Sequence, residues 1–290
     1  MTLITWAITP EYAVIVSDRR VTRLVRGRAV SFEDSAMKTF LLNGQLLMGF
    51  TGLAEVGGQS MAEWVADRLA GQNPLDWPEI LRDAMQAYYG TTPAVRGIPH
   101  HFRLLGFGYN TARVPARIPM GIEVSNCEWR EAGGRVQAYG VGDFTVRHNG
   151  LGNHRVLVGA VGSPYPHRAL RELERSIKFV HRANADNVAA TFEPILQFHQ
   201  LVSAKSGGTV GDTAVVTAIR SRHVPITDLG WSTPLTTEGI ESATQHPFSA
   251  TFSPNGDATA HLPVVIHRDI QLLDMTFGPD ISHLGGGTSP

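Results

Sequence analysis

The alternation of two apolar patterns along the chain limits the folds that it can adopt. Short β-branched runs predict strands, and apolar residues at helical spacing predict helices. The predicted strands are residues 3–8, 12–17, 38–42, 45–51, 102–109, 121–124, 136–141, 155–161 and 212–219. The predicted helices are residues 54–69, 78–89, 165–181 and 187–202. The order is therefore strands, two helices, strands, two helices and a strand.

This order predicts an α+β fold for residues 2–220. Two antiparallel sheets packed face to face, with a helix pair over each outer face, bury every apolar side. We therefore expect a four-layer αββα sandwich. Residues 221–283 predict a partly β C-terminal extension, with a hairpin around Asn255-Gly256-Asp257 and a strand at 262–266. Residues 284–290 predict a disordered tail.

Two hairpins are predicted within the first fifty residues. Thr9-Pro10-Glu11 separates the first pair of apolar runs, and Asn43-Gly44 separates the second. Asn-Gly between apolar runs is the strongest short-range hairpin signal. Asp18 ends the second predicted strand and Lys38 begins the third, so a hairpin sheet can bring both side chains beside Thr2.

The charge balance argues against nucleic-acid and membrane partners. The chain has 25 basic and 26 acidic side chains, a formal net charge of −1. Binding to nucleic acid or to anionic lipid needs a basic surplus. The arginine-rich segment 19–28 has no interleaved aromatic residue, so it predicts a solvated loop or an interface.

The remaining composition predicts a cytoplasmic protein without a cofactor. Cys127 is the only cysteine, so no internal disulfide can form. No signal-peptide pattern and no apolar run of about 20 residues is present. His100-His101 lacks the spacing of a metal site, and the glycines follow no phosphate-loop pattern, so we predict neither metal nor cofactor.

An N-terminal threonine can supply both a nucleophile and its base. A hydroxyl is a poor nucleophile until a base takes its proton. The α-amine of a first residue, with a pKa of about 7.7–8, serves after a small downward shift. A neighbouring lysine produces that shift, a carboxylate holds the lysine, and a backbone N–H stabilises the oxyanion.

The sequence contains one residue for each of these roles, in order. Thr2 is exposed by removal of Met1, Asp18 and Lys38 are the carboxylate and the lysine, and Gly52 follows a predicted strand. Each residue alone also has an ordinary structural explanation, as a strand cap, a surface lysine or a strand end. The prediction therefore depends on their order and spacing together.

Five segments carry a resemblance to a known family. They are residues 17–22 (Ser-Asp-Arg-Arg-Val-Thr), 38–40 (Lys-Thr-Phe), 49–55 (Gly-Phe-Thr-Gly-Leu-Ala-Glu), 158–165 (Val-Gly-Ala-Val-Gly-Ser-Pro-Tyr) and 203–208 (Ser-Ala-Lys-Ser-Gly-Gly). Together with Thr2, they resemble the proteasome β-subunit family of N-terminal-nucleophile (Ntn) hydrolases, whose bacterial relatives include the HslV and Anbu types. The resemblance covers about Thr2 to Ile219 and implies the same αββα sandwich.

The resemblance also implies roles for individual residues. Thr2 is the nucleophile, Lys38 lowers the local pKa values, Asp18 positions Lys38, Gly52 donates to the oxyanion, and Ser206 is a partner of the Thr2 amine. The implied substrates are peptides, or alternatively small amides.

A substrate pocket and an assembly are implied as well. The pocket is lined by Val21, Phe40, Phe50 and Ala54, although core packing is an alternative for Phe40. Family members assemble into rings, so the chain is expected to form a homo-oligomer and to have an unfoldase as a partner.

The chain departs from the family pattern at two positions. The family's active-site serine falls on Ala160 or Val161, with Ser163 as the nearby hydroxyl, and its second aspartate is Ser203. Both groups support the amine, so their loss favours slower proton transfer. A catalytically impaired scaffold or assembly subunit is therefore the alternative function.

Overall fold

The protein has a mixed α+β fold with several antiparallel sheets. A computed structural model describes residues 2–25, 28–34, 36–42, 46–72, 76–92, 101–110, 118–140, 142–150, 156–221, 232–234, 248–254, 258–261 and 265–266. Within this part of the chain there are four α-helices. No helix among these residues is long and apolar enough to span a membrane.

The larger sheet has seven antiparallel strands, with β16 at its centre and β1 and β2 on one side of it. In spatial order they are β14 (Leu157–Val161), β1 (Ile4–Ile8), β2 (Tyr12–Asp18), β16 (Ala214–Arg220), β18 (Phe248–Phe252), β19 (Ala258–His261) and β17 (Ser232–Pro234). The first and last residues of β2 are buried, as are all the residues between them. This pattern is typical of a central strand covered on both faces.

The second large sheet has six strands. In spatial order they are β13 (Thr145–Gly150), β10 (Ile118–Ser125), β9 (Arg103–Asn110), β6 (Leu46–Thr51), β5 (Thr39–Leu42) and β20 (Val265–Ile266). The short strand β20 pairs with β5 in parallel, whereas the other neighbours are antiparallel.

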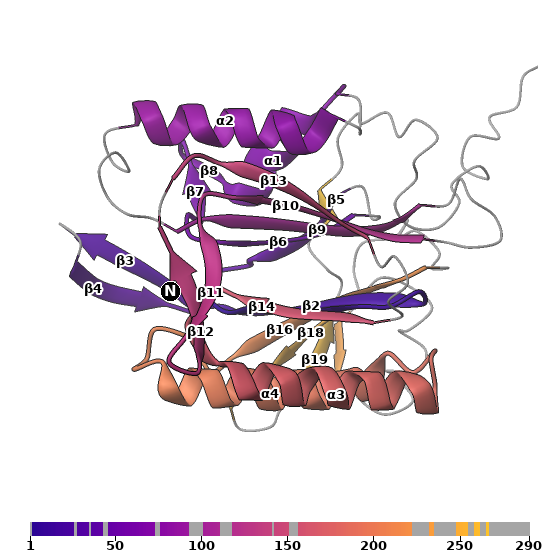
Figure 1. Ribbon diagram of the computed structural model, residues 1–290. Helices are drawn as coiled ribbons and strands as arrows, with labels where there is room; N and C mark the ends of the chain where they lie inside the picture. Colours follow the sequence, from indigo (N-terminus) through magenta and orange to yellow (C-terminus); the bar gives the residue numbers. More distant parts are fainter. Residues whose placement is uncertain are drawn as a thin grey trace, which may run out of the picture.

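Three small sheets accompany the large ones. They are β11 (Glu128–Ala132) with β12 (Arg135–Tyr139) and β15 (Tyr165–Pro166), the hairpin of β3 (Val21–Val25) and β4 (Arg28–Glu33), and the hairpin of β7 (Glu55–Val56) and β8 (Gln59–Ser60). The β3–β4 hairpin projects from the body of the molecule (Figure 1).

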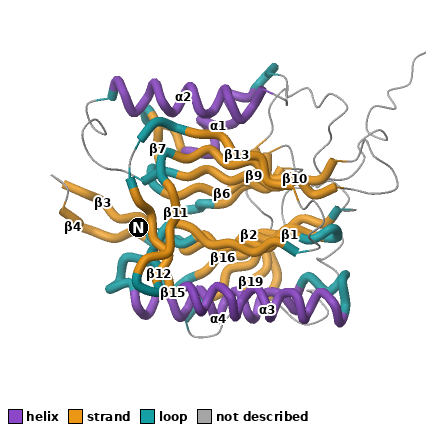
Figure 2. Tube along the Cα trace, in the orientation of Figure 1, coloured by secondary structure: helices purple, strands orange, loops and turns teal. Residues whose placement is uncertain are grey.

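The helices cover the outer faces of the two large sheets. They are α1 (Met61–Leu69), α2 (Trp77–Thr91), α3 (His167–Ala183) and α4 (Phe192–Lys205), with a 3-10 turn at Ala189–Thr191 before α4. In Figures 1 and 2, α1 and α2 lie over the six-stranded sheet, and α3 and α4 lie over the seven-stranded sheet. The inner faces of the two sheets face each other.

Alternating side chains of the strands build three hydrophobic clusters. Ile15 of β2 and Leu47 of β6 belong to the cluster between the sheets, which we call the inter-sheet core. Val16 belongs to the cluster under α3 and α4, and Met48 to the cluster under α1 and α2. Neighbouring residues of one strand thus enter different clusters, as the period of two requires.

Hydroxyl groups also join the two sheets. Thr39 of β5 shares a hydrogen bond of 3.0 Å with Thr217 of β16, whose hydroxyl meets that of Ser249 of β18 at 2.7 Å. All three residues are buried. The bonds satisfy polar groups that would otherwise be costly between two apolar faces.

Most predicted strands and all four predicted helices are present, with shifted ends. The prediction that the first helix starts at residue 54 was wrong, because Gly57 and Gly58 turn the chain between β7 and β8. The helix begins after Ser60, whose side chain accepts from the backbone of Glu63 while Glu63 accepts from the backbone of Ser60. This capping box marks the true start.

The starting residues of α3 and α4 also differ from the prediction. Tyr165 and Pro166 pair with β12, so α3 begins at His167 and not at residue 165. Residues 187–191 are not α-helical, and α4 begins at Phe192. The solvated loop predicted at residues 19–28 is corrected, since this segment contains β3 and the first residue of β4, whereas the alternative of an interface stays a prediction.

The strands after residue 220 join both large sheets. β18 pairs with β16, and β20 pairs with β5. The antiparallel pairing of β18 with β19 confirms the predicted hairpin, although Asn255-Gly256-Asp257 itself lies outside the described residues. The turn Asn43-Gly44 and the tail 284–290 also lie outside them, and the division into a domain and an extension stays a prediction.

Candidate functional site

The start of β1 is tied to the end of β2 beside Thr2. Leu3 donates its backbone N–H to Asp18 Oδ1 at 2.8 Å, and Asp18 N donates to Leu3 O at 3.2 Å. Thr2 is buried with them, at 8% exposure. The carboxylate of Asp18 therefore holds the backbone one residue after Thr2.

Lys38 reaches the same carboxylate from the opposite sheet. It directly precedes β5, and its Nζ donates to Asp18 Oδ2 at 3.0 Å and also to the carbonyl of Arg20. Lys38 is 2% exposed and Asp18 is 0% exposed. Because β2 and β5 belong to different sheets, this buried ion pair links the two sheets beside Thr2, which precedes β1 by two residues.

Asp18 receives further donors that make its burial tolerable. Its Oδ2 accepts from Arg20 N at 3.1 Å and from Gly211 N at 3.3 Å. With Leu3 N and Lys38 Nζ, these bonds occupy both carboxylate oxygens. A buried charge needs such a complete set of partners, since removing it from water is expensive.

Burial lowers the pKa of Lys38. Desolvation is the largest cause, and the charge and hydrogen bond of Asp18 act against it. Asp34 also raises the pKa of Lys38, while Arg20 lowers it. Lys38 is thus a lysine whose charge depends on its neighbours, unlike a solvated surface lysine.

Two glycines allow close backbone packing around the turn after β6. Gly52 packs against His101, and Gly162 packs against Thr2. Gly52 has φ +100°, and a Cβ there would lie 2.6 Å from His101 O. Gly162 has φ +109°, and a Cβ there would overlap the carbonyl oxygen of Thr2 and approach Thr51 Cγ2 at 3.3 Å. The backbone of Gly162 therefore packs closely against Thr2 and Thr51, and Thr51 directly precedes Gly52. Glycine is required at both positions for steric reasons.

The two departures from the family pattern have defined places. Ala160 is part of the cluster under α3 and α4, whereas Val161 pairs with Ile4 and enters the inter-sheet core. Neither side chain carries a hydroxyl. Ser163 is buried and directly follows Gly162, so its hydroxyl lies on the segment that packs against Thr2.

Ser206 makes hydrogen bonds within the turn after α4, and its predicted role beside the Thr2 amine stays a prediction. Its hydroxyl donates to Ser203 O at 2.8 Å and accepts from Val210 N at 3.1 Å. Ser203 in turn donates to Val210 O at 3.2 Å. Both serines thus hold the turn after α4, and among the described residues no hydrogen bond joins Ser206 to Thr2.

Three of the four predicted pocket residues lie in or against the cluster under α1 and α2. Phe40 and Phe50 are buried in it, and Ala54 packs against it. Val21 is half-buried at the start of β3. Phe50 therefore faces α1 and not the inter-sheet core. Core packing accounts for Phe40 and Phe50 in this structure, and their contact with substrate stays a prediction.

Sequence reasoning missed three residues around the ion pair. Arg20 and Gly211 supply backbone groups to it, and His199 of α4 lies near enough for its charge to interact with Asp18 and Lys38. His199 is 1% exposed, its Nε2 has no hydrogen-bond partner, and burial lowers its pKa to about 4. Its position one helical turn before Ser203 was the available signal.

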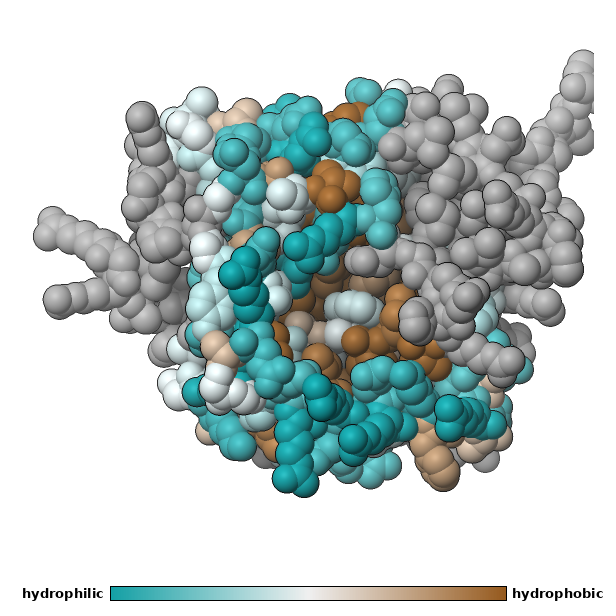
Figure 3. Space-filling view, in the orientation of Figure 1, coloured by the Kyte–Doolittle hydropathy of each residue, from teal (hydrophilic) through white to brown (hydrophobic). Residues whose placement is uncertain are grey.

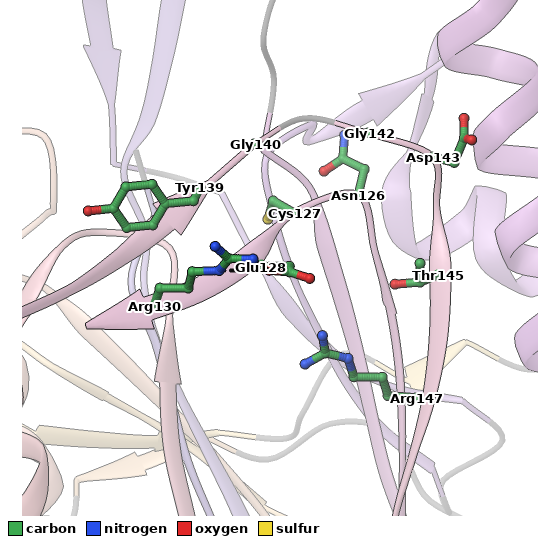
Figure 4. A pocket seen from close by; sticks show the side chains of 10 residues that line it. All are labelled: Asn126, Cys127, Glu128, Arg130, Tyr139, Gly140, Gly142, Asp143, Thr145 and Arg147. Atoms are coloured by element: carbon green, nitrogen blue, oxygen red, sulfur yellow. Dashed lines mark hydrogen bonds and ion pairs between the residues drawn. The ribbon is translucent and has the colours of Figure 1, made fainter. Parts of the chain in front are cut away.

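A cavity lies between the β11–β12 hairpin and β13. It has a volume of about 420 Å³. The lining residues are Asn126, Cys127, Glu128, Arg130, Tyr139, Gly140, Gly142, Asp143, Thr145 and Arg147 (Figure 4). Glu128 pairs with Arg130, and Asp143 accepts from Gln86. Burial raises the pKa of the Cys127 thiol, so this cysteine is not an activated nucleophile.

Figure 3, in the orientation of Figure 1, shows a hollow in the middle of this face, where hydrophobic residues lie between hydrophilic ones above and below. In the described part of the chain, no three His, Cys, Asp or Glu side chains gather into a possible metal site.

A scan against models of protein families finds no match, and a search of curated proteins finds no significant one. The choice of function therefore depends on the geometry around Asp18 and Lys38.

Proposed function

We propose that the chain is a threonine-type Ntn hydrolase that cleaves peptides or small amides. Thr2 becomes the nucleophile once Met1 is removed. The observation that carries the proposal is the buried Lys38–Asp18 pair, with the same carboxylate bonded to Leu3 N. A buried ion pair is a poor way to gain stability, so its position beside Thr2 favours a catalytic use.

Each group has a step in the reaction. The α-amine of Thr2 takes the hydroxyl proton as Oγ attacks the amide carbon, and the N–H of Gly52 donates to the oxyanion. The amine then gives the proton to the leaving nitrogen, the C–N bond breaks, and an ester remains on Thr2. Water, deprotonated by the same amine, hydrolyses this ester. Positive Lys38 keeps the amine neutral.

The arrangement of layers supports the same proposal. Helices on both outer faces and two facing sheets are the layers that the αββα sandwich of Ntn hydrolases requires, and the resemblance to proteasome β-subunits suggests the same class. A cytoplasmic homo-oligomer, such as a ring that works with an unfoldase, follows from this proposal. Fold alone does not determine function, so the site remains its main support.

Labelling of Thr2 tests the proposal directly. Mass spectrometry of the purified protein should show loss of Met1, and an epoxyketone or β-lactone probe should add to the new N-terminus. Thr2→Ala should abolish labelling, whereas Thr92→Ala, at the end of α2, should label like the wild type. Retained Met1 in the folded protein, or equal labelling of wild type and Thr2→Ala, would contradict the proposal.

A non-catalytic assembly subunit is the second candidate. The absence of hydroxyls at Ala160 and Val161, and the engagement of Ser206 with Val210, favour it. It predicts that the wild type shows only background labelling. Native mass measurement should then give the same oligomer for the wild type and for Thr2→Ala.

A further inference from the structure

Arg20 supplies two backbone contacts to the buried ion pair. Its N–H donates to Asp18 Oδ2 at 3.1 Å, and its carbonyl accepts from Lys38 Nζ. One peptide segment therefore touches both members of the pair. Any movement of this segment changes the distance between Lys38 Nζ and the carbonyl of Arg20, one of its two hydrogen-bond acceptors.

The side chain of Arg20 fixes this segment from outside. Nε and Nη2 donate to the two oxygens of Asp34, each at 2.7 Å, and Nη1 donates to Gly208 O at 2.8 Å. Asp212 lies 3.9 Å away. The bidentate pair with Asp34 closes the base of the β3–β4 hairpin, and the bond to Gly208 joins it to the turn after α4. Such fork-shaped pairs fix orientation as well as distance.

Gly211 shows how closely these segments pack. A Cβ there would lie 3.1 Å from Arg20 Cβ and 3.3 Å from Asp34 Oδ1. Its N–H donates to Asp18 at 3.3 Å. The Arg20–Asp34 pair and the Lys38–Asp18 pair therefore form two adjacent layers around one short stretch of backbone.

We infer that Arg20 is a positioning residue for Lys38. We also infer that the charges of Arg20 and Asp34, which pair with each other, offset each other's electrostatic effect on Lys38. The inference deepens the proposed function and rests on it for its catalytic meaning, because Lys38 is the cation that prepares the Thr2 amine. The placement of Lys38 by Arg20 is measurable without any activity.

The two partners act on Lys38 with opposite signs. Arg20 lowers the pKa of Lys38 and Asp34 raises it. The other titratable groups that face this cluster are Asp18, His199 and Asp212. A purely structural role for the outer pair predicts that losing either partner has the same effect, whereas charge balance predicts opposite effects.

The experiment is a double-mutant cycle of Arg20 and Asp34 in which the pKa of Lys38 is measured. The chain has only three lysines, Lys38, Lys178 and Lys205, so a ¹³C-lysine NMR titration resolves each of them, with Lys38→Arg for assignment. Arg20→Met should raise the pKa of Lys38, because Asp34 is left unbalanced. Asp34→Asn should lower it, and the double variant should return it toward the wild-type value. Low salt is needed because Asp34 is 46% exposed.

A conservative variant and a control variant separate the effect of the Arg20 charge from the effect of its hydrogen bonds. Arg20→Lys keeps the positive charge but cannot form the bidentate pair with Asp34. It should therefore leave the pKa of Lys38 near the wild-type value. It should slow the labelling of Thr2 roughly tenfold, because hydrogen bonds that position the segment are lost. Arg168→Met removes an exposed arginine that pairs with Glu172 on α3 and should change neither readout.

The possible outcomes are distinct. Shifts of Lys38 in the same direction for Arg20→Met and Asp34→Asn, or no shift in either, would overturn the inference. If Arg20→Met does not fold, Asp34→Asn and Arg20→Lys still decide it. Opposite shifts without any labelling of Thr2 would support the placement of Lys38 by Arg20 and refute the proposed function.

Discussion

At the scale of single residues, Asp18 and Lys38 place a buried ion pair beside Thr2, and Arg103 and Glu123 form another buried pair elsewhere in the described chain. Asp18 is bonded to Lys38, while His199 remains neutral beneath it. Buried ionisable groups are costly, and a cluster of them beside a chain terminus needs a reason beyond stability. Their protonation nevertheless contributes to stability, which gives a test that is independent of catalysis.

His199 should make the free energy of unfolding depend on pH. Its folded pKa is about 4, below the value of about 6.5 in an unfolded chain. Between these values the unfolded chain binds more protons, so stability rises with pH and is lost as pH falls from about 6.5 toward 4. The loss amounts to about 3 kcal/mol. Urea unfolding at pH 7 and at pH 5, which lies inside this range, should detect about 2 kcal/mol of the full loss.

The matched variants are His199→Leu and His148→Gln. The first should flatten the pH dependence, since no imidazole remains to charge on unfolding. The second changes an exposed histidine and should keep the wild-type slope. An unchanged slope in His199→Leu would show that other groups cause the dependence.

Single residues were predictable where they carry a short motif. Thr2, Asp18, Lys38 and Gly52 stand out by order and spacing, and the structure joins Asp18 to Lys38. The Arg20–Gly208 bond spans 188 positions, so no local pattern indicates it. The role of Ser206 in the turn after α4 was equally hidden, because hydroxyls have many possible partners.

At the scale of elements, local chemistry determines where each helix and strand ends. Hydrophobic periodicity predicted that helices exist near residues 54–69 and 187–202, but it extends into flanking turns and strands whose apolar residues also face the core. Caps define the ends better than periodicity does. The β3–β4 hairpin was missed because its arginines resemble a solvated loop.

The capping box of α1 should be measurable. Ser60→Ala removes the acceptor for Glu63 N and should cost about 1 kcal/mol of unfolding free energy. Ser176→Ala, at an exposed position within α3, is the control and should be near neutral. Chemical denaturation of both variants measures the difference, and equal stabilities would show that the cap contributes nothing.

At the scale of the whole molecule, the sheets are completed by the last described strands. β18 covers β16, and β20 covers β5. The general order of layers was predictable from the apolar patterns, since only face-to-face sheets bury them all. The pairing of residues 265–266 with β5 was not, because a two-residue parallel contact leaves no pattern in the sequence.

Truncation should therefore distinguish an appended segment from an integral one. Ending the chain after Arg220 removes β17 to β20 and exposes the edges of β16 and β5, so we expect aggregation or a large loss of stability. Ending it after Ile266 keeps both sheets and serves as the control. Light scattering and thermal unfolding measure the outcome, and a stable, monodisperse chain of residues 1–220 would contradict the expectation.

The pairing of β20 with β5 also has a consequence during synthesis. β5 begins at Thr39, directly after Lys38, yet its second neighbour is formed by Val265 and Ile266. A ribosome adds about 5–20 residues each second, so more than 200 residues must emerge before that neighbour exists. The nascent chain therefore carries an unpaired edge of β5 beside Lys38 for about ten seconds or longer, and chaperones can bind the chain during this period.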